Sequence, residues 1–225
     1  MMKSSKRSAN RSILTDEQLK GISARDLSKV HLTDDERLRL RKIIEERNER
    51  IELRATLMEI EEEPIIADLR KVGWNVSSVW DLVSVSKNYS EAIPVLLHHL
   101  LLPYSDKIRE GIARDLAVPD ARHAWPILVS EYKKAPQGWD FKVKGDPEKL
   151  KLGAKNGLAC ALAATVSNTT MPELIDIVRD ATHGESRLIL LPALHKSKNP
   201  LAKQALVDLA TDPDLAIEIA SWRKR

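Results

Sequence analysis

The stretch SRLILLPALHK, residues 186–196, decides the fold because it is the third copy of one pattern. IREGIARDLAV (108–118) and AKNGLACALAA (154–164) align with it without gaps. A basic residue coincides in the three copies, and an apolar triplet follows it in register: Arg109 with Ile112, Ala113 and Leu116; Lys155 with Leu158, Ala159 and Leu162; Arg187 with Leu190, Leu191 and Leu194. A chain rich in leucine and alanine and poor in glycine favours helices, so the pattern predicts a repeated helix.

Each copy is preceded by another amphipathic segment, at 90–103, 120–136 and 171–184. A fourth pair of segments closes the chain at 199–222. The repeating unit is therefore two helices joined by a short turn, with a period of roughly thirty residues and one longer member. Because neither helix can bury its apolar side alone, successive units must stack on one another. This pattern predicts an all-α fold, an α-α superhelix.

Two phrases carry a resemblance to a known family. YSDKIREGIARDLA (104–117) and TDPDLAIEIA (211–220) look like an aspartate-containing turn followed by a basic residue and an Ala/Leu-rich second helix. The chain resembles the HEAT-repeat family in its short bacterial form over residues 64–225. The resemblance implies a solenoid of antiparallel helix pairs, with residues 64–86 as an atypical capping unit. Pro192 departs from the family pattern and is expected to kink its helix.

Residues 1–32 are expected to form a basic, flexible tail with one short helix. Residues 1–33 carry seven basic and three acidic side chains, an excess of four positive charges. The polar, serine-rich start has no apolar periodicity, which is typical of disorder. TDEQLKGIS (15–23) predicts a short helix capped by Thr15.

Residues 33–63 predict one long, charged helical arm. Thr33 stands at the N-cap, Glu36 completes a capping box, and neither glycine nor proline occurs before Pro64. The apolar positions are too sparse for a regular coiled coil. The arm therefore either packs on the body of the protein or joins a second copy in a homodimer, and both alternatives stay open.

Composition narrows the class of protein. The net charge is only +3, from 36 basic and 33 acidic residues, which is weaker than the basic stripe of a dedicated duplex-DNA binder. The single cysteine, Cys160, cannot form an internal disulfide and lies among small apolar residues, as expected for a packing residue in a reducing compartment. No apolar run is long enough to span a bilayer. A cytoplasmic protein without a membrane partner is expected.

One stretch, THGESRLILLPALHKS (182–197), collects a histidine, a glutamate, a serine and an arginine like an active site. Its place in the repeat indicates a helix junction instead, in which Gly184 ends one helix and the next begins near Ser186. His98 and His99 are adjacent and would point about 100° apart on a helix, which does not suit a shared metal. We find no motif for a catalytic, metal or cofactor site, so no enzyme is predicted.

The basic residues in register are the first candidate binding residues. The HEAT resemblance implies that second helices line a concave surface, which would place Arg109, Lys155 and Arg187 in a row there. The alternative is that these side chains tie neighbouring turns together through aspartates such as Asp106.

The insertion 136–151 is the second candidate surface. It interleaves Trp139 and Phe141 with Lys142 and Lys144, a mixture that suits protein hot spots and base stacking alike. The alternative is that Trp139 folds back on the helices as a plug.

The function predicted from these features is non-catalytic binding of another protein, as an adaptor, a regulatory subunit or an inhibitor of the immunity type. The concave face and the 136–151 insertion would form the binding surface. The alternative is a nucleic-acid-binding protein that uses the basic tail, the lysine-rich insertion and the groove arginines.

Overall fold

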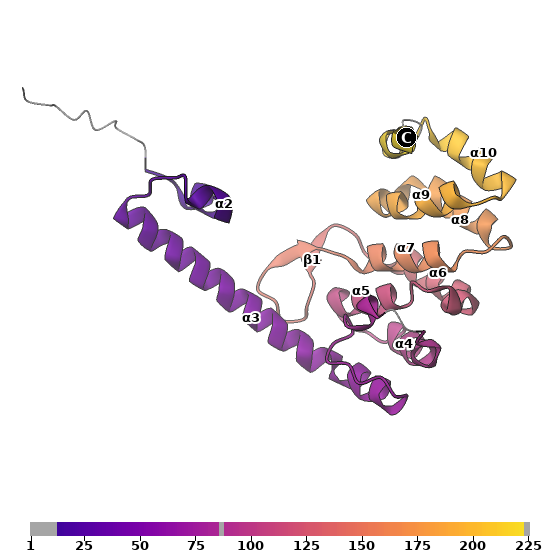
Figure 1. Ribbon diagram of the computed structural model, residues 1–225, viewed down its shortest axis with the longest axis horizontal. Coiled ribbons are helices and arrows are strands. Elements are labelled where there is room, and N and C mark those ends of the chain that lie inside the picture. Colours follow the sequence, from indigo (N-terminus) through magenta and orange to yellow (C-terminus); the bar gives the residue numbers. More distant parts are fainter. Residues whose placement is uncertain (1–12, 86–87, 223–225) are drawn as a thin grey trace, which may run out of the picture. The chain divides into compact units, whose positions relative to one another are not determined.

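The computed structural model describes residues 13–85 and 88–222, and over these residues the chain is mostly helical (Figure 1). The first twelve residues of the predicted basic tail lie outside the described residues. The chain divides into two compact units, residues 1–53 and 54–225, each with its own apolar core. The helices and strands of the described part are α1 Asp16–Lys20, α2 Ala24–Leu27, α3 Asp34–Lys71, α4 Ile93–Leu100, α5 Asp106–Asp115, α6 Trp125–Lys134, β1 Trp139–Phe141, β2 Lys149–Lys151, α7 Ala154–Thr165, α8 Met171–Arg179, α9 Arg187–Lys196, α10 Pro200–Leu209 and α11 Ala216–Trp222, with the 3-10 helices η1 Leu82–Ser84, η2 Ser90–Ala92, η3 Pro119–Ala124 and η4 Ala181–Ser186.

The first unit consists of α1, α2 and the start of α3. Both predicted helix starts are confirmed: Thr15 forms a capping box with Gln18, and Thr33 and Glu36 bond to each other's backbone N–H at 3.2 and 2.8 Å. A small core of three buried leucines, Leu19, Leu32 and Leu40, joins the helices.

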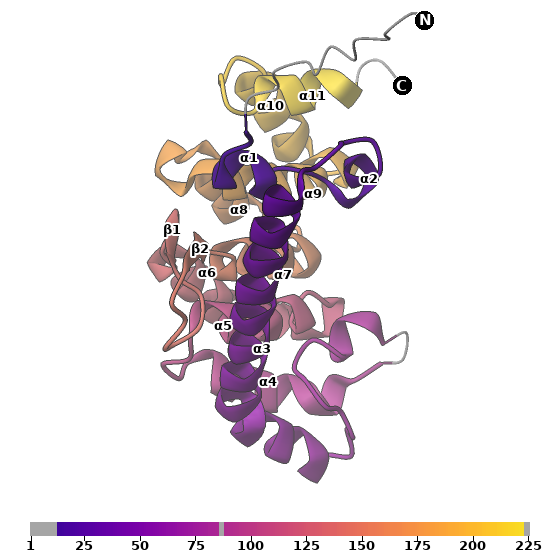
Figure 2. The same ribbon diagram turned by 90° about the vertical axis from the view of Figure 1, so that its left-hand side faces the viewer.

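Helix α3 is longer than expected, since it continues through Pro64 to Lys71 (Figure 2). A proline inside a helix removes one N–H bond, but the turn that follows buries Ile65, Ile66 and Leu69, which outweighs the loss. The capping unit expected over residues 64–86 needs a correction: residues 64–71 belong to α3, and residues 72–85 hold only the 3-10 helix η1. Among the described residues, no separate helix pair caps the unit there.

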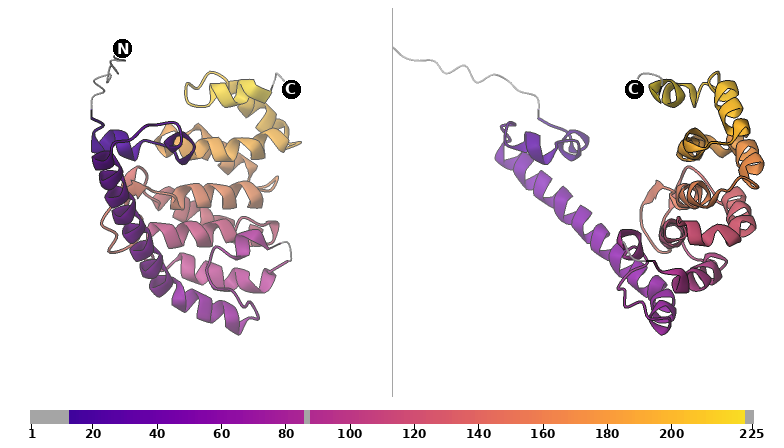
Figure 3. Two further views of the ribbon diagram at one scale, coloured as in Figure 1. Left: turned by 60° about the vertical axis from the view of Figure 1, so that its left-hand side comes forward. Right: turned by 45° about the vertical axis from the view of Figure 1, so that its right-hand side comes forward.

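The second unit is built from successive helix pairs: α4 with α5, α6 with α7, α8 with α9, and α10 with α11. Helix α5 packs on α7 and α7 on α9, while α8 packs on α10. The first helices form one row and the second helices another, in chain order (Figures 1 and 3). Each first helix has a proline in its opening turn, where the missing N–H costs nothing. This recurrence of Pro94, Pro126, Pro172 and Pro200 is a repeat signal that our alignment of second helices did not use.

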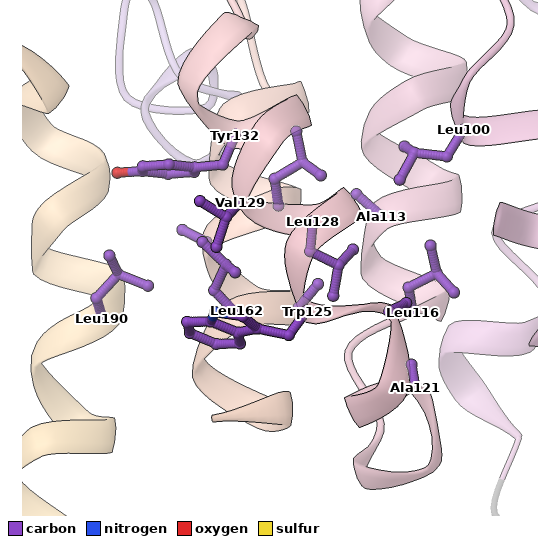
Figure 4. Close-up of a cluster of buried hydrophobic side chains, with 14 of the residues drawn as sticks. Leu100, Ala113, Leu116, Ala121, Trp125, Leu128, Val129, Tyr132, Leu162 and Leu190 are labelled. Atoms are coloured by element: carbon purple, nitrogen blue, oxygen red, sulfur yellow. The ribbon is translucent and has the colours of Figure 1, made fainter. Parts of the chain in front are cut away.

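The apolar triplets of the three sequence copies form the centre of the core. All nine side chains are fully buried, as predicted, and Figure 4 shows several of them with the aromatic rings of Trp125 and Tyr132. Helices α5 and α7 approach closely at Gly157, where an added Cβ would lie 2.8 Å from the main-chain oxygen of Glu110. A side chain there would push the two helices apart.

The expectation of a purely α-helical chain needs one correction. Residues of the insertion form a short antiparallel hairpin, in which Trp139 faces Lys151, Asp140 faces Leu150 and Phe141 faces Lys149. Pro192 does not interrupt α9, which runs unbroken to Lys196. Within the described ranges, no helix combines the length and apolar character that crossing a bilayer requires.

Candidate functional site

The basic row, which consists of Arg109, Lys155 and Arg187, belongs to the second unit and is largely buried in it. Arg187 is fully buried, Lys155 is buried and Arg109 is half-buried. The expectation that they present their charges to a groove is therefore corrected. The physical reason is their spacing. Each basic residue precedes the three members of its apolar triplet by three, four and seven positions, and this spacing places it on the same buried helix face as the triplet.

Arg187 joins three parts of the chain. Its Nη1 pairs with the Asp212 carboxylate at 2.7 Å and donates to the Val178 carbonyl at 3.3 Å, while Nη2 pairs with Asp214 at 2.7 Å. The Nε atom donates to the Gly184 carbonyl at 3.3 Å. The hydrogen bond from Arg187 holds the pKa of Asp212 below its usual value. Arg187 thus links the end of α8 to the turn before α11.

Lys155 and Arg109 make comparable contacts one and two units before Arg187, respectively. Arg109 Nη1 donates to the Leu100 carbonyl at 2.8 Å, at the end of α4, and its Nη2 pairs with Glu131 of α6 at 2.8 Å. Lys155 Nζ lies 3.5 Å from the Ala135 carbonyl, at the end of α6, and 4.8 Å from the centre of the Tyr132 ring. Burial lowers the pKa of Lys155.

The three residues therefore share one contact, the carbonyl end of the preceding first helix, which otherwise lacks partners. This geometry agrees with the tying alternative, although the acidic partner differs from the one expected. Asp106 does not pair with the row. Its carboxylate accepts from the N–H groups of Gly153 and Ala154 at 2.7 and 2.9 Å, at the start of α7.

The insertion presents its two aromatic side chains to solvent. Trp139 is 69% exposed and Phe141 is 50% exposed, so the plug alternative for Trp139 is wrong. Directly paired residues of a hairpin point to the same face, which places Lys151 beside Trp139 and Lys149 beside Phe141. The Lys149 ammonium lies 5.2 Å from the centre of the Phe141 ring. One face of the hairpin thus carries two rings and two lysines, and we call these four residues the aromatic face.

The base of the hairpin is firmly held. Arg54 of α3 binds Asp146 through two nitrogens and Glu148 at 3.3 Å. The Lys107 N–H donates to the Lys142 carbonyl at 2.9 Å, and Val143 is fully buried. These contacts fix the orientation of the aromatic face relative to α5 and to residues 54–71 of α3.

Lys142 and Lys144 differ in their surroundings. Lys144 is exposed. Lys142 is turned inward, with its Nζ 3.2 Å from Glu110 and 4.0 Å from Asp106. Burial alone would raise the pKa of Glu110, but Lys107 and Lys142 hold it below its usual value. Lys142 therefore anchors the insertion, and three of the four predicted insertion residues face solvent.

The stretch 182–197 is a junction, as expected, but its helix boundary differs. Helix α8 ends at Arg179, the 3-10 helix η4 follows, and Gly184 breaks it with φ 58° and ψ −143°. The Ser186 hydroxyl hydrogen bonds to Tyr132 and to the His183 carbonyl, both at 2.7 Å. The polar residues of this stretch therefore serve packing.

Two further titratable side chains, His99 and Cys160, also have structural surroundings. Buried His99 bridges Asp68 at 3.1 Å and the Tyr104 hydroxyl at 2.9 Å. Cys160 borders a cavity of about 530 Å³, and burial raises the pKa of its thiol, which does not suit a nucleophile. No cluster of three metal-ligating side chains occurs among residues 13–85 and 88–222.

The aromatic face is the candidate functional site, because it combines exposed rings with a fixed support. The composition of the 136–151 insertion was enough to single out its two aromatic residues. It did not place Lys149 and Lys151 on the same face, because the strand register was not predicted. Comparisons with family models, with curated proteins and with solved structures find no match to this chain.

Proposed function

We propose that this chain is a non-catalytic, protein-binding α-solenoid of the HEAT-like type that recognises its partner through the aromatic face. The observation that carries the proposal is the exposure of Trp139 and Phe141 on an anchored hairpin. Large rings that are exposed in the free protein and held in place are the usual centre of a protein interface. The HEAT-like reading is supported by the ordered helix pairs and by the basic residue that recurs in three second helices.

The arrangement also favours a role for the scaffold itself. Arg109 and Arg187 each tie their own helix pair to the next one, and Lys155 ties α7 to α6 within its own pair. The row of second helices therefore offers a support for the hairpin rather than a charged groove, and these ties hold the helices in a fixed order. A rigid support reduces the ordering cost that a loop would otherwise incur on binding.

A double substitution, Trp139→Ala with Phe141→Ala, tests the proposal. Affinity purification from native extract, with the intact chain as bait, should recover a partner that the double variant loses. Loss of two central aromatic anchors corresponds to at least about 2 kcal/mol, or roughly thirty-fold in Kd. Because both side chains are exposed, the free energy of unfolding should change by less than about 0.5 kcal/mol.

The matched control is Leu201→Ala with Ile217→Ala, which removes two apolar side chains that are 56% and 84% exposed elsewhere in the unit. This control should recover the partner as well as the unaltered chain does. Equal recovery by the hairpin variant would show that the aromatic face is not the binding surface.

Nucleic acid is the second candidate, because rings beside lysines also suit base stacking. Neutralising several phosphates requires a basic stripe, and none forms here, because each lysine of the hairpin has a carboxylate beside it: Glu110 beside Lys142, Asp140 at 3.1 Å from Lys149, and Glu185 beside Lys151. A gel-shift series with single-stranded DNA across salt separates the two functions. A shift at low salt that is lost in the hairpin variant would favour nucleic acid.

A further inference from the structure

The hairpin has an open edge beside the aromatic face. Among the described residues, β1 and β2 pair only with each other, so each strand has one side without a neighbouring strand. All three residues of β1 are exposed. An exposed strand edge is a ready template for another extended chain.

The hydrogen-bond register shows which main-chain groups of β1 point outward. The Leu152 N–H donates to the Gly138 carbonyl at 2.8 Å, which makes these two residues a hydrogen-bonded pair. Along an antiparallel ladder, hydrogen-bonded pairs alternate with pairs whose main-chain groups point outward. Asp140 therefore bonds to β2, and the N–H and C=O groups of Trp139 and Phe141 point away from β2 toward the open edge.

A second observation agrees with this register. The carboxylate of Asp140 has a lowered pKa, first because of its hydrogen bond with Lys149 and then because the Phe141 N–H lies against it. This agrees with the outward direction that the strand register gives to that N–H. The Asp140 side chain is 58% exposed, so the main-chain carbonyl of an incoming strand can replace its carboxylate as the acceptor for the Phe141 N–H.

The charge around this edge selects the chemistry of a partner. The carboxylates of Asp146 and Glu148 are held by Arg54, whereas the ion pairs of Lys149 and Lys151 are exposed on both sides. Exposed pairs contribute no more than about 1 kcal/mol and exchange partners easily. Lys144 is exposed nearby. The aromatic face itself carries two lysines and no carboxylate, because Asp140 alternates to the opposite face of β1. An acidic segment laid on this face therefore meets positive charge.

We propose that the partner binds as a third strand on the open edge of β1, through an extended segment that carries acidic residues and β-branched or aromatic ones. This inference rests on the proposed function and names its mode of recognition. Main-chain bonds to Trp139 and Phe141 supply register, the two rings pack against alternate side chains of the segment, and Lys149 and Lys151 bind its carboxylates. The anchored base keeps the edge ordered before binding.

A displayed library of random dodecapeptides, selected on the full chain and counter-selected on the W139A/F141A variant, supplies the probe. We expect selected peptides to alternate β-branched or aromatic residues with others and to carry a net negative charge. Lys149→Gln with Lys151→Gln should weaken their binding about tenfold, whereas Lys196→Gln with Lys203→Gln, at exposed positions of α9 and α10, should leave it unchanged.

Amide hydrogen exchange, measured by NMR on the full chain with a selected peptide, tests the strand itself. The Trp139 and Phe141 amides should exchange at least tenfold more slowly in the complex, while the Asp140 amide, already in the ladder, should change less. Binding that depends on the rings without slower exchange at these two amides would overturn strand addition and leave the proposed function standing. A selection that yields no peptide dependent on the hairpin would overturn both.

Discussion

At the scale of single residues, Asp115 is the most unusual group in the protein. It is the last residue of α5, it is fully buried, and neither carboxylate oxygen has a hydrogen-bond partner among the described residues. Burial, with a smaller contribution from Asp81, raises its pKa to about 9. The carbonyl end of a helix also disfavours a negative charge. Asp115 is therefore a neutral carboxylic acid at pH 7.

The raised pKa makes the stability of the protein depend on pH. In the unfolded chain Asp115 titrates near pH 3.9. Below that pH the group is protonated in both states and contributes no pH dependence, and stability falls as the pH rises from about 4 to about 9. Asp115→Asn keeps the shape and removes the charge. At pH 7 the variant should be more stable than the parent by on the order of 2–4 kcal/mol, and at pH 4 the two should be equal.

Urea unfolding of both proteins at pH 4, 6 and 8 measures this difference. Asp208→Asn is the control, because Asp208 is exposed to solvent and its pKa is lowered by Gln204 and Arg179 rather than raised. Relative to the parent, the Asp208→Asn variant should not gain stability as the pH rises. An unchanged difference between parent and Asp115→Asn across the three pH values would mean that Asp115 is ionised when folded.

At the scale of elements, the helix pairs depend on buried ties. Arg187→Met keeps much of the side-chain volume, but it leaves the Asp212 carboxylate and the Val178 carbonyl, near the end of α8, without their donor. Removing one partner of a fully buried ion pair costs about 3–5 kcal/mol. Because Asp212 is 19% exposed and Asp214 is 63% exposed, the carboxylates left behind stay partly hydrated, and we expect a cost of about 2–3 kcal/mol. Arg179→Met is the matched change, since Arg179 and Asp208 form an exposed pair at 2.7 Å that contributes less than about 1 kcal/mol. Urea unfolding should separate the two variants, and equal costs would show that the Arg187 tie is dispensable.

The same elements show how far sequence reasoning reaches. Helix starts at Thr15 and Thr33 and the buried apolar triplets follow from local chemistry and periodicity, and both were predicted. The burial of Arg187 could have been predicted as well, because it precedes Leu190, Leu191 and Leu194 by three, four and seven residues. The hairpin could not, because strands of three residues are too short for an alternation pattern to appear. Pro64 was misjudged because the burial of the next turn outweighed a local rule.

At the scale of the whole molecule, the two compact units differ greatly in the size of their cores. The first unit buries three leucines, with a few half-buried apolar side chains around them, whereas the second buries a continuous cluster that runs from Ile65 to Ile219. Local opening requires less free energy where fewer apolar contacts must be broken. The units should therefore open separately rather than in one cooperative step.

The difference in local opening between the two units can be measured along helix α3, because this helix belongs to both. Between residues 41 and 53 it exposes Ile44 and Ile51, while residues 54–71 bury Ile65 and Leu69. Native-state hydrogen exchange on the full chain should find amides of residues 41–53 exchanging at least about a hundredfold faster than those around Leu69. The slowest amides should lie in α5, α7 and α9. Uniform protection along α3 would contradict this, since it would require the whole helix to open only with the larger core.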